Sequence, residues 1–97
     1  MATKEQILEF LRSVKSELRL KYKVKEIGVF GSVARGEQNE FSDIDFLVEF
    51  EEGADLLHLS GLKIFLKEEL NHEVDIVSKR VLRREFRDQV LKEFVQA

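Results

Sequence analysis

A Gly31-Ser32 dipeptide and two aspartates, Asp43 and Asp45, are the residues of this sequence best suited to chemistry. A turn at Gly31-Ser32, which follows the apolar run 27–30, would expose backbone N–H groups that bind phosphate. Asp43 and Asp45 begin a second apolar run and, on a strand, would share one side, roughly 6.5–7 Å apart along the chain. Two neighbouring carboxylates repel unless a cation lies between them, and their oxygens suit a hard ion such as Mg²⁺. The pattern predicts a phosphate-binding turn facing a metal-binding carboxylate pair.

A third carboxylate, Asp75, lies between two apolar neighbours in a short run. On a strand the neighbours would point to the core and Asp75 to the opposite face. If this strand lies beside the one that carries Asp45, the three carboxylates form one acidic cluster. Two ions held about 3.5–4 Å apart by such a cluster would clamp an in-line phosphoryl displacement. One ion would activate an attacking hydroxyl, and the other would hold a triphosphate and neutralise the leaving pyrophosphate.

The elements that must position these residues follow from hydrophobic periodicity. Thr3 and Gln6 form a capping-box pattern ahead of apolar residues at helical spacing. The predicted helices cover 4–20, 54–70 and 79–95, with a short helix from Gly31 through Arg35. The predicted strands cover 24–30, 44–50 and 73–77. This order predicts an α/β fold, a three-stranded mixed sheet with helices packed on it, in one domain of residues 1–97.

Composition excludes several classes of protein. The chain has 97 residues, of which 43% are hydrophobic, so an ordinary globular core is expected rather than disorder. It contains no cysteine, which rules out disulfides, thiolate metal sites and a cysteine nucleophile. The start of the chain is unlike a signal peptide and no apolar run approaches membrane-spanning length, so we expect a cytoplasmic protein without a membrane partner. A net charge of −3 argues against a general nucleic-acid-binding protein.

The combined motif is similar to that of a known family. Gly31-Ser32, ten intervening residues, Asp43-Ile44-Asp45 and the later Asp75 resemble the DNA polymerase β-like nucleotidyltransferase superfamily. The fuller strings, Gly-Ser-x-Ala-Arg-Gly and Ser-Asp-x-Asp-x-x-Val, resemble the minimal nucleotidyltransferase (MNT) proteins in particular. The resemblance covers nearly the whole chain, and the combined motif is specific where either half alone would be weak.

The resemblance implies an enzyme with ATP or another NTP as substrate and two Mg²⁺ ions as cofactors. It implies that Asp43 and Asp45 bind both ions, and that Asp75 binds the catalytic ion and helps to deprotonate the acceptor. Gly31 and Ser32 would hold the nucleotide phosphates. In the MNT family the partner is commonly a HEPN-domain toxin, and the MNT protein acts as an antitoxin by transferring AMP onto a tyrosine of that toxin. None of this pairing is visible in the residues themselves.

Ordinary structural explanations exist for each part of the motif. Gly31-Ser32 alone would be a strand-to-helix turn with a serine cap, and the aspartates alone would be the exposed face of a half-buried strand. Their conjunction at the family's spacing favours a nucleotidyltransferase site. Arg35 has two explanations that remain open: contact with a phosphate or the nucleotide, or pairing with Glu37 or Glu40.

Four arginines near the end of the chain have the i, i+3, i+4, i+7 spacing of one helix face: Arg80, Arg83, Arg84 and Arg87. They could dock an acidic partner or contact nucleotide or RNA. A solvated helix face with acidic neighbours is the favoured interpretation, since such faces are common.

We expect this chain, from its shortness, to carry no second domain that could hold an acceptor. We therefore expect a partner chain or a second copy of this protein to supply that hydroxyl. Alternatives are transfer to a small-molecule hydroxyl, neutralisation of a toxin by stoichiometric binding without catalysis, and an RNA-binding module, which the acidic balance disfavours. The sequence shows no base-selective pocket that would identify the NTP.

Overall fold

A computed structural model describes residues 3–37, 39 and 41–97. Along the chain the elements are α1 (Lys4–Ser13), α2 (Lys15–Tyr22), β1 (Val24–Phe30), α3 (Gly31–Arg35), β2 (Ile44–Phe50), α4 (Leu56–Leu70), β3 (Val74–Ser78), a 3₁₀ turn η1 (Lys79–Val81), α5 (Arg84–Glu93) and β4 (Val95–Gln96). The strands form one mixed sheet in the order β3-β2-β1-β4. β2 runs parallel to β3, and β1 runs antiparallel to both β2 and β4. The predicted α/β fold with a mixed sheet is confirmed, with a short fourth strand added.

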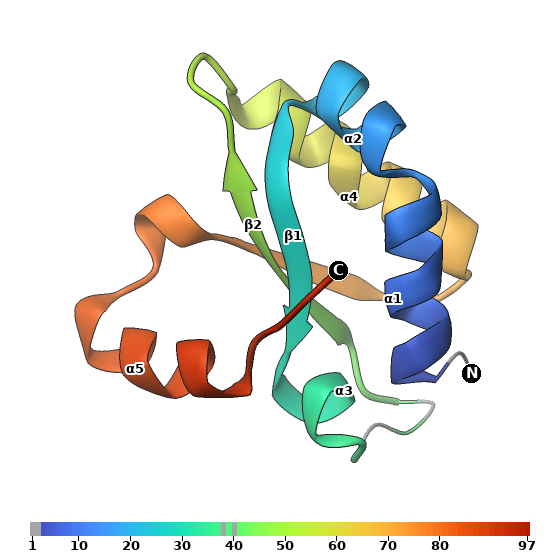
Figure 1. Ribbon diagram of the computed structural model, residues 1–97, viewed down its shortest axis with the longest axis vertical. Coiled ribbons are helices and arrows are strands. Elements are labelled where there is room, and N and C mark those ends of the chain that lie inside the picture. The colour runs from blue at the N-terminus through green and yellow to red at the C-terminus, as the bar shows by residue number, and fades with distance from the viewer. Residues whose placement is uncertain (1–2, 38, 40) are drawn as a thin grey trace.

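Helices α1, α2 and α4 cover one face of the sheet, and α5 lies on the other side (Figure 1). Side chains that alternate along β2 point in turn to the helix-covered face and to the opposite face of the sheet. Ile44, Phe46 and Val48 are fully buried in the core beneath the helices. Asp45, two residues before Leu47, therefore points to the opposite face. The strand pattern predicted for β2 is confirmed, because alternation on a half-covered sheet leaves a polar residue no other side to occupy.

The helix predicted over 4–20 is two helices. Its start is as expected, since the Thr3 side chain accepts from the Gln6 N–H and the Gln6 side chain accepts from the Thr3 N–H. Val14 separates α1 from α2 with φ −111° and ψ 12°, outside helical geometry. Leu11 and Leu18, on either side of the break, are both completely buried. The bend lets both helices pack against one twisted sheet, a requirement that local periodicity does not contain.

The helix predicted over 79–95 is wrong at both ends. The segment begins as η1, continues as α5 from Arg84, and ends in β4, which pairs with β1. The Ala97 N–H donates to the Ile27 carbonyl at 3.0 Å, so the end of the chain provides hydrogen-bonding partners for backbone groups at the edge of β1. Gly28 permits this, because a Cβ there would collide with the Phe94 ring and the Val95 carbonyl.

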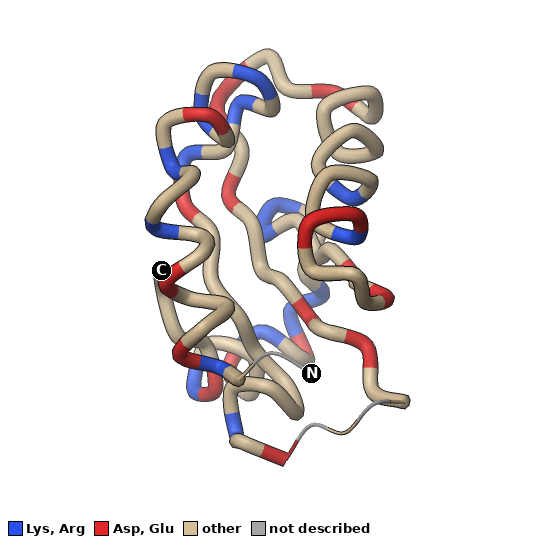
Figure 2. The backbone as a smooth tube through the Cα atoms, turned by 90° about the vertical axis from the view of Figure 1, so that its right-hand side faces the viewer, with Lys and Arg blue, Asp and Glu red and all other residues tan. Residues whose placement is uncertain are grey.

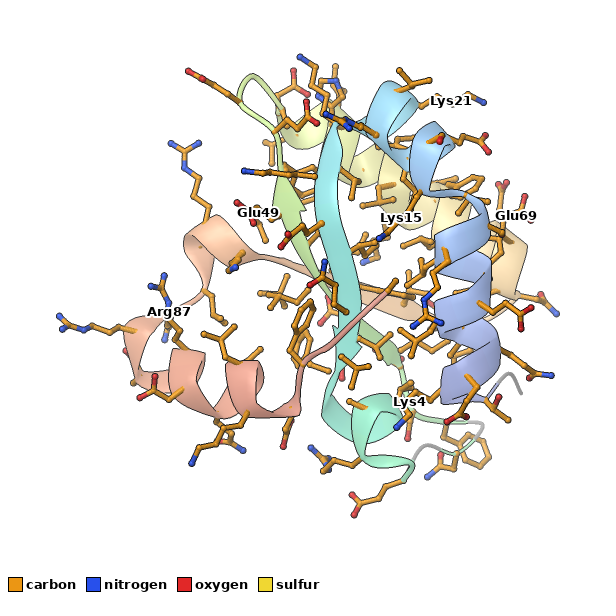
Figure 3. All side chains as sticks on the ribbon, in the orientation of Figure 1. Lys4, Lys15, Lys21, Glu49, Glu69 and Arg87 are labelled. Atoms are coloured by element: carbon orange, nitrogen blue, oxygen red, sulfur yellow. The ribbon has the colours of Figure 1, made fainter. Side chains whose placement is uncertain are left out.

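The arginine stripe predicted for that helix does not form. Arg80 lies in η1 and Arg83 is the residue before α5, so only Arg84 and Arg87 lie on the helix. Arg87 projects from α5 away from the strands (Figure 3). Acidic and basic positions are interspersed along the chain (Figure 2). Helix α5 itself contains no fully buried residue, and its Phe86 is 52% exposed.

Helix α4 begins at Leu56, two residues later than predicted. The Asp55 carboxylate caps it by accepting from the Leu57 and His58 N–H groups, and the His58 ring accepts from the Asp55 N–H. This reciprocal cap fixes the helix start and gives His58 a structural role. Among the described residues, no helix is both long and apolar enough to cross a membrane.

Candidate active site

The residues of the predicted site meet where β1 ends and β2 and β3 begin. This is the lower end of the sheet in Figure 1, next to α3. Strand register places Phe30 of β1 opposite Asp45 of β2, and Asp45 opposite Asp75 of β3. Gly31 directly follows Phe30 in the chain. Gly31, Asp45 and Asp75 thus form a row across three neighbouring strands.

Position 31 has two structural requirements that only glycine meets easily. Its φ is +72°, in the left-handed region that residues with a Cβ rarely adopt. A Cβ at this position would also lie 2.5 Å from the Oδ2 of Asp45. The glycine therefore allows the Asp45 carboxylate to lie directly against the turn that begins α3. Ser32 follows it, partly exposed, in the first turn of α3 where backbone N–H groups have no intrahelical acceptor.

The carboxylates of the site influence one another electrostatically. The pKa of Asp45 is raised from 3.8 to about 6, mainly by burial and then by the negative charges of Asp75 and Asp43. The charge of Arg35 acts in the opposite sense and lowers the pKa. Asp43 stands just before β2 and is exposed, as is Asp75. Asp43 and Asp75 therefore lie close enough to Asp45 for their charges to raise its pKa, as the predicted cluster requires.

These carboxylates are not preassembled as a metal site. No group of three or more His, Cys, Asp or Glu side chains in the described part of the chain is arranged to hold a metal ion. The chemistry of the donors nevertheless fits a hard divalent cation, because all three groups present carboxylate oxygens. Mutual repulsion favours separation of the side chains when no cation is bound, and after burial it is the next cause of the raised pKa of Asp45.

A fourth acidic residue on the same face of β2, Glu49, has a different environment. It lies near the carboxyl end of the strand (Figure 3), 3.8 Å from both Lys25 and Lys79. Two lysines neutralise it, whereas Asp45 has two carboxylates for neighbours. The acidic cluster is therefore confined to the end of the sheet that carries Gly31.

Arg35, for which two roles were open, is paired in the structure. Its Nε donates to Glu37 at 2.9 Å, and its Nη1 donates to Glu93 of α5 at 2.8 Å. The Glu37 contact was one of the predicted alternatives, while a contact with Glu40 falls outside the described residues. The Glu93 contact was missed, because it joins residues 58 positions apart and no local pattern signals it. Its charge still reaches Asp45.

His72, which is half-buried, contacts the loop that carries Asp43. Its Nε2 hydrogen bonds with the Ser42 carbonyl, and the neighbouring Glu73 carbonyl accepts from the Ile44 N–H at 3.0 Å. The start of β3 therefore holds the start of β2 on both sides of Asp43. The residues are some thirty positions apart, so sequence spacing could not reveal the contact.

The raised pKa of Asp45 makes a prediction about stability. Since the folded-state pKa of about 6 exceeds the ordinary value of 3.8, Asp45 destabilises the folded protein increasingly as the pH rises between those values. Asp45→Asn removes this titration. In EDTA we expect the variant to unfold at a higher temperature than wild type at pH 8, by on the order of a few degrees, and the gap to shrink at pH 4. Thermal melts at both pH values test this, and a gap that widens at pH 4 would contradict it.

A glycine turn beside carboxylates at one end of a mixed sheet is an arrangement that fits the transfer of a phosphorus-containing group. Comparison with known families agrees. Residues 11–96 match the model of the nucleotidyltransferase domain. The chain belongs to this family, and it is a nucleotidyltransferase of the minimal type predicted from the motif.

Individual relatives and structures are similar over most of the chain. The protein adenylyltransferase MntA of Thermococcus cleftensis is 45% identical over 95 residues, covering 98% of this chain and 96% of the relative. A solved minimal nucleotidyltransferase superposes with a TM-score of 0.75 at 45% identity, covering 91% of this chain and 93% of the other. A toxin–antitoxin crystal structure with AMP-PNP superposes with a TM-score of 0.70 at 28% identity, covering 87% and 69%.

Proposed function

We propose that this protein transfers AMP from ATP onto a hydroxyl group of a partner protein, and that the partner is a HEPN-domain toxin modified on a tyrosine. The observation that carries the proposal is the row of Gly31, Asp45 and Asp75 on adjacent strands. The naming of a 45% identical relative as a protein adenylyltransferase supports AMP as the transferred group. The similar toxin–antitoxin structure with AMP-PNP supports an adenine nucleotide and a toxin partner.

The proposed reaction is an in-line displacement at the α-phosphorus. The acceptor oxygen forms a bond to that phosphorus while the bond to the bridging oxygen breaks, and pyrophosphate leaves with the electron pair. Asp75 takes the hydroxyl proton as general base, at one end of the row. Backbone N–H groups of Gly31 and Ser32 hold phosphate oxygens at the other end. The acceptor and the leaving group must lie on opposite sides of the phosphorus, which matches the separation of β1 from β3 by β2.

Two Mg²⁺ ions held by Asp43, Asp45 and Asp75 would neutralise the developing charge and acidify the acceptor hydroxyl. A cation held there would offset the repulsion that, after burial, contributes to the raised pKa of Asp45. Arg35 is available to the nucleotide phosphates if it exchanges its partners Glu37 and Glu93 for them. The pair with Glu37 is exposed, and such surface pairs are worth little. The pair with Glu93, whose side chain is 22% exposed, must open as well.

A transfer assay tests the proposal. The protein is incubated with the purified partner, Mg²⁺ and each of ATP, GTP, CTP and UTP, and the partner is weighed by intact-protein mass spectrometry. We expect the mass of the partner to rise by one or more AMP units with ATP, and tandem mass spectrometry to place them on tyrosine. EDTA should suppress the gain. Absence of any added nucleotide with all four substrates would refute nucleotidyl transfer to this partner.

A further inference from the structure

An open hollow of about 790 Å³ borders the candidate active site, between the loop before β2 and the C-terminal half of α4. Two large apolar side chains from these different elements line it and are exposed to water, Phe41 at 88% and Ile64 at 58%. Asp43 lines the same hollow. One wall is therefore a proposed catalytic carboxylate, and the others include unpartnered apolar surface.

Contacts between neighbouring elements hold the rim of the hollow. The His72 contact with the Ser42 carbonyl and the bond from Ile44 N–H to the Glu73 carbonyl hold the loop at Asp43. Lys67 of α4 pairs with Glu73 at 3.0 Å across the turn that joins α4 to β3. The hollow is thus framed by contacts among the loop before β2, the start of β3 and the C-terminal end of α4.

Its position places the hollow on the acceptor side of the site. The sheet order puts Gly31 at the end of β1, Asp45 on β2 and Asp75 on β3. If the phosphates rest at Gly31, an in-line displacement brings the acceptor from the β3 side. The hollow lies on that side, because residues of the α4–β3 connection, Asn71 to Glu73, help to line it.

The charge of the hollow selects the kind of ligand. Asp43, Glu68 and Glu73 contribute carboxylates to the lining, and Lys67 is already paired with Glu73. A phosphate or other anion would be repelled by this surface. An uncharged aromatic ring with a hydroxyl group could pack on Phe41 and Ile64 and bring its oxygen toward Asp43. The volume exceeds one ring, so flanking residues of the partner can enter too.

We propose that this hollow binds the acceptor, an uncharged aromatic side chain carrying the hydroxyl together with the partner segment around it, packed between Phe41 and Ile64. This inference rests on the proposed function and identifies the surface on which its acceptor is held. The adenine base of the nucleotide is the competing occupant, and the experiment below separates the two.

Steady-state kinetics of Phe41→Ala and Ile64→Ala test the assignment. Both side chains are exposed, so their truncation should leave the fold intact. We expect KM for the partner protein to rise about tenfold or more in each variant, while KM for ATP stays within about twofold. Leu57→Ala is the matched control, since Leu57 is 80% exposed on the same helix but outside the hollow. It should change neither constant.

The results distinguish failure of this inference from failure of the proposed function. If wild type transfers AMP but both variants keep their KM for the partner, the acceptor binds elsewhere. If KM for ATP rises instead, the hollow holds the base.

A binding measurement covers the case of no transfer at all. N-acetyltyrosinamide should shift the Ile64 methyl resonance in an NMR titration and spare the Leu57 methyls, whereas AMP should leave Ile64 unchanged. A shift of Ile64 by AMP alone, or by neither probe, would overturn the proposal.

Discussion

Replacing Asp43 and Asp45 together by asparagine should reduce nucleotidyl transfer by about a thousandfold or more. The change removes two negative charges from the proposed metal site, and with them several kilocalories per mole of charge stabilisation in the transition state. Folding should be preserved, because asparagine has nearly the same shape and because burial and the neighbouring carboxylates already disfavour the charged form of Asp45. Transfer rates, Mg²⁺ binding by calorimetry and circular dichroism measure the three outcomes.

Glu49→Gln is the control for that double variant. Glu49 lies on the same face of β2, but Lys25 and Lys79 neutralise it, so its loss should leave transfer close to the wild-type rate. Full transfer by the double variant would show that the site is wrongly assigned. Neutralisation of the toxin without transfer would instead favour stoichiometric binding as the antitoxin mechanism.

The second large effect is expected for Gly31→Ala. The added Cβ would lie 2.5 Å from Asp45 Oδ2 and must displace that carboxylate or the turn. A misplacement of about 1 Å in a catalytic group can cost on the order of a hundredfold in rate, so we expect a loss of at least that size. The left-handed φ of +72° should also lower stability by about 1–2 kcal/mol. Single-turnover rates and urea unfolding measure the two effects separately.

Gly36→Ala separates the two causes, because Gly36 has nearly the same backbone conformation, with φ +73°, and nothing within 4 Å of an added Cβ. It should lose similar stability and keep most of its transfer activity. Equal losses of activity in both variants would mean that backbone strain at α3, and not contact with Asp45, controls the site.

The core strands and the motif were predictable because both are local. Alternation in β2 separates Ile44 and Phe46 from Asp45 within a few residues, and burial follows from that alternation. The expectation that Asp75 joins Asp45 was conditional on strand order. The parallel pairing of β2 with β3 in the register Asp45 opposite Asp75 meets the condition. The roles assigned to Gly31, Ser32, Arg35 and the aspartates stay predictions until the variants are measured.

The errors lie where distant parts of the chain meet. The break at Val14 follows from packing two helix segments on one sheet, and the apolar spacing continues through it unchanged. The end of the last predicted helix became β4 because the edge of β1 needs a hydrogen-bonding partner. At its other end, the segment begins as η1 instead of as part of α5. The arginines are therefore dispersed, since a stripe at helical spacing exists only where the helix is continuous.

By itself, then, the sequence determined the α/β class, the family and the residues that meet at the end of the sheet, because periodicity and motif spacing act over short stretches of chain. The tertiary structure alone decided that Arg35 pairs with Glu93, that His72 holds the loop at Asp43, and that an apolar hollow opens beside the carboxylates. These features depend on contacts between residues tens of positions apart. Such contacts form only once the sheet brings its strands and helices together.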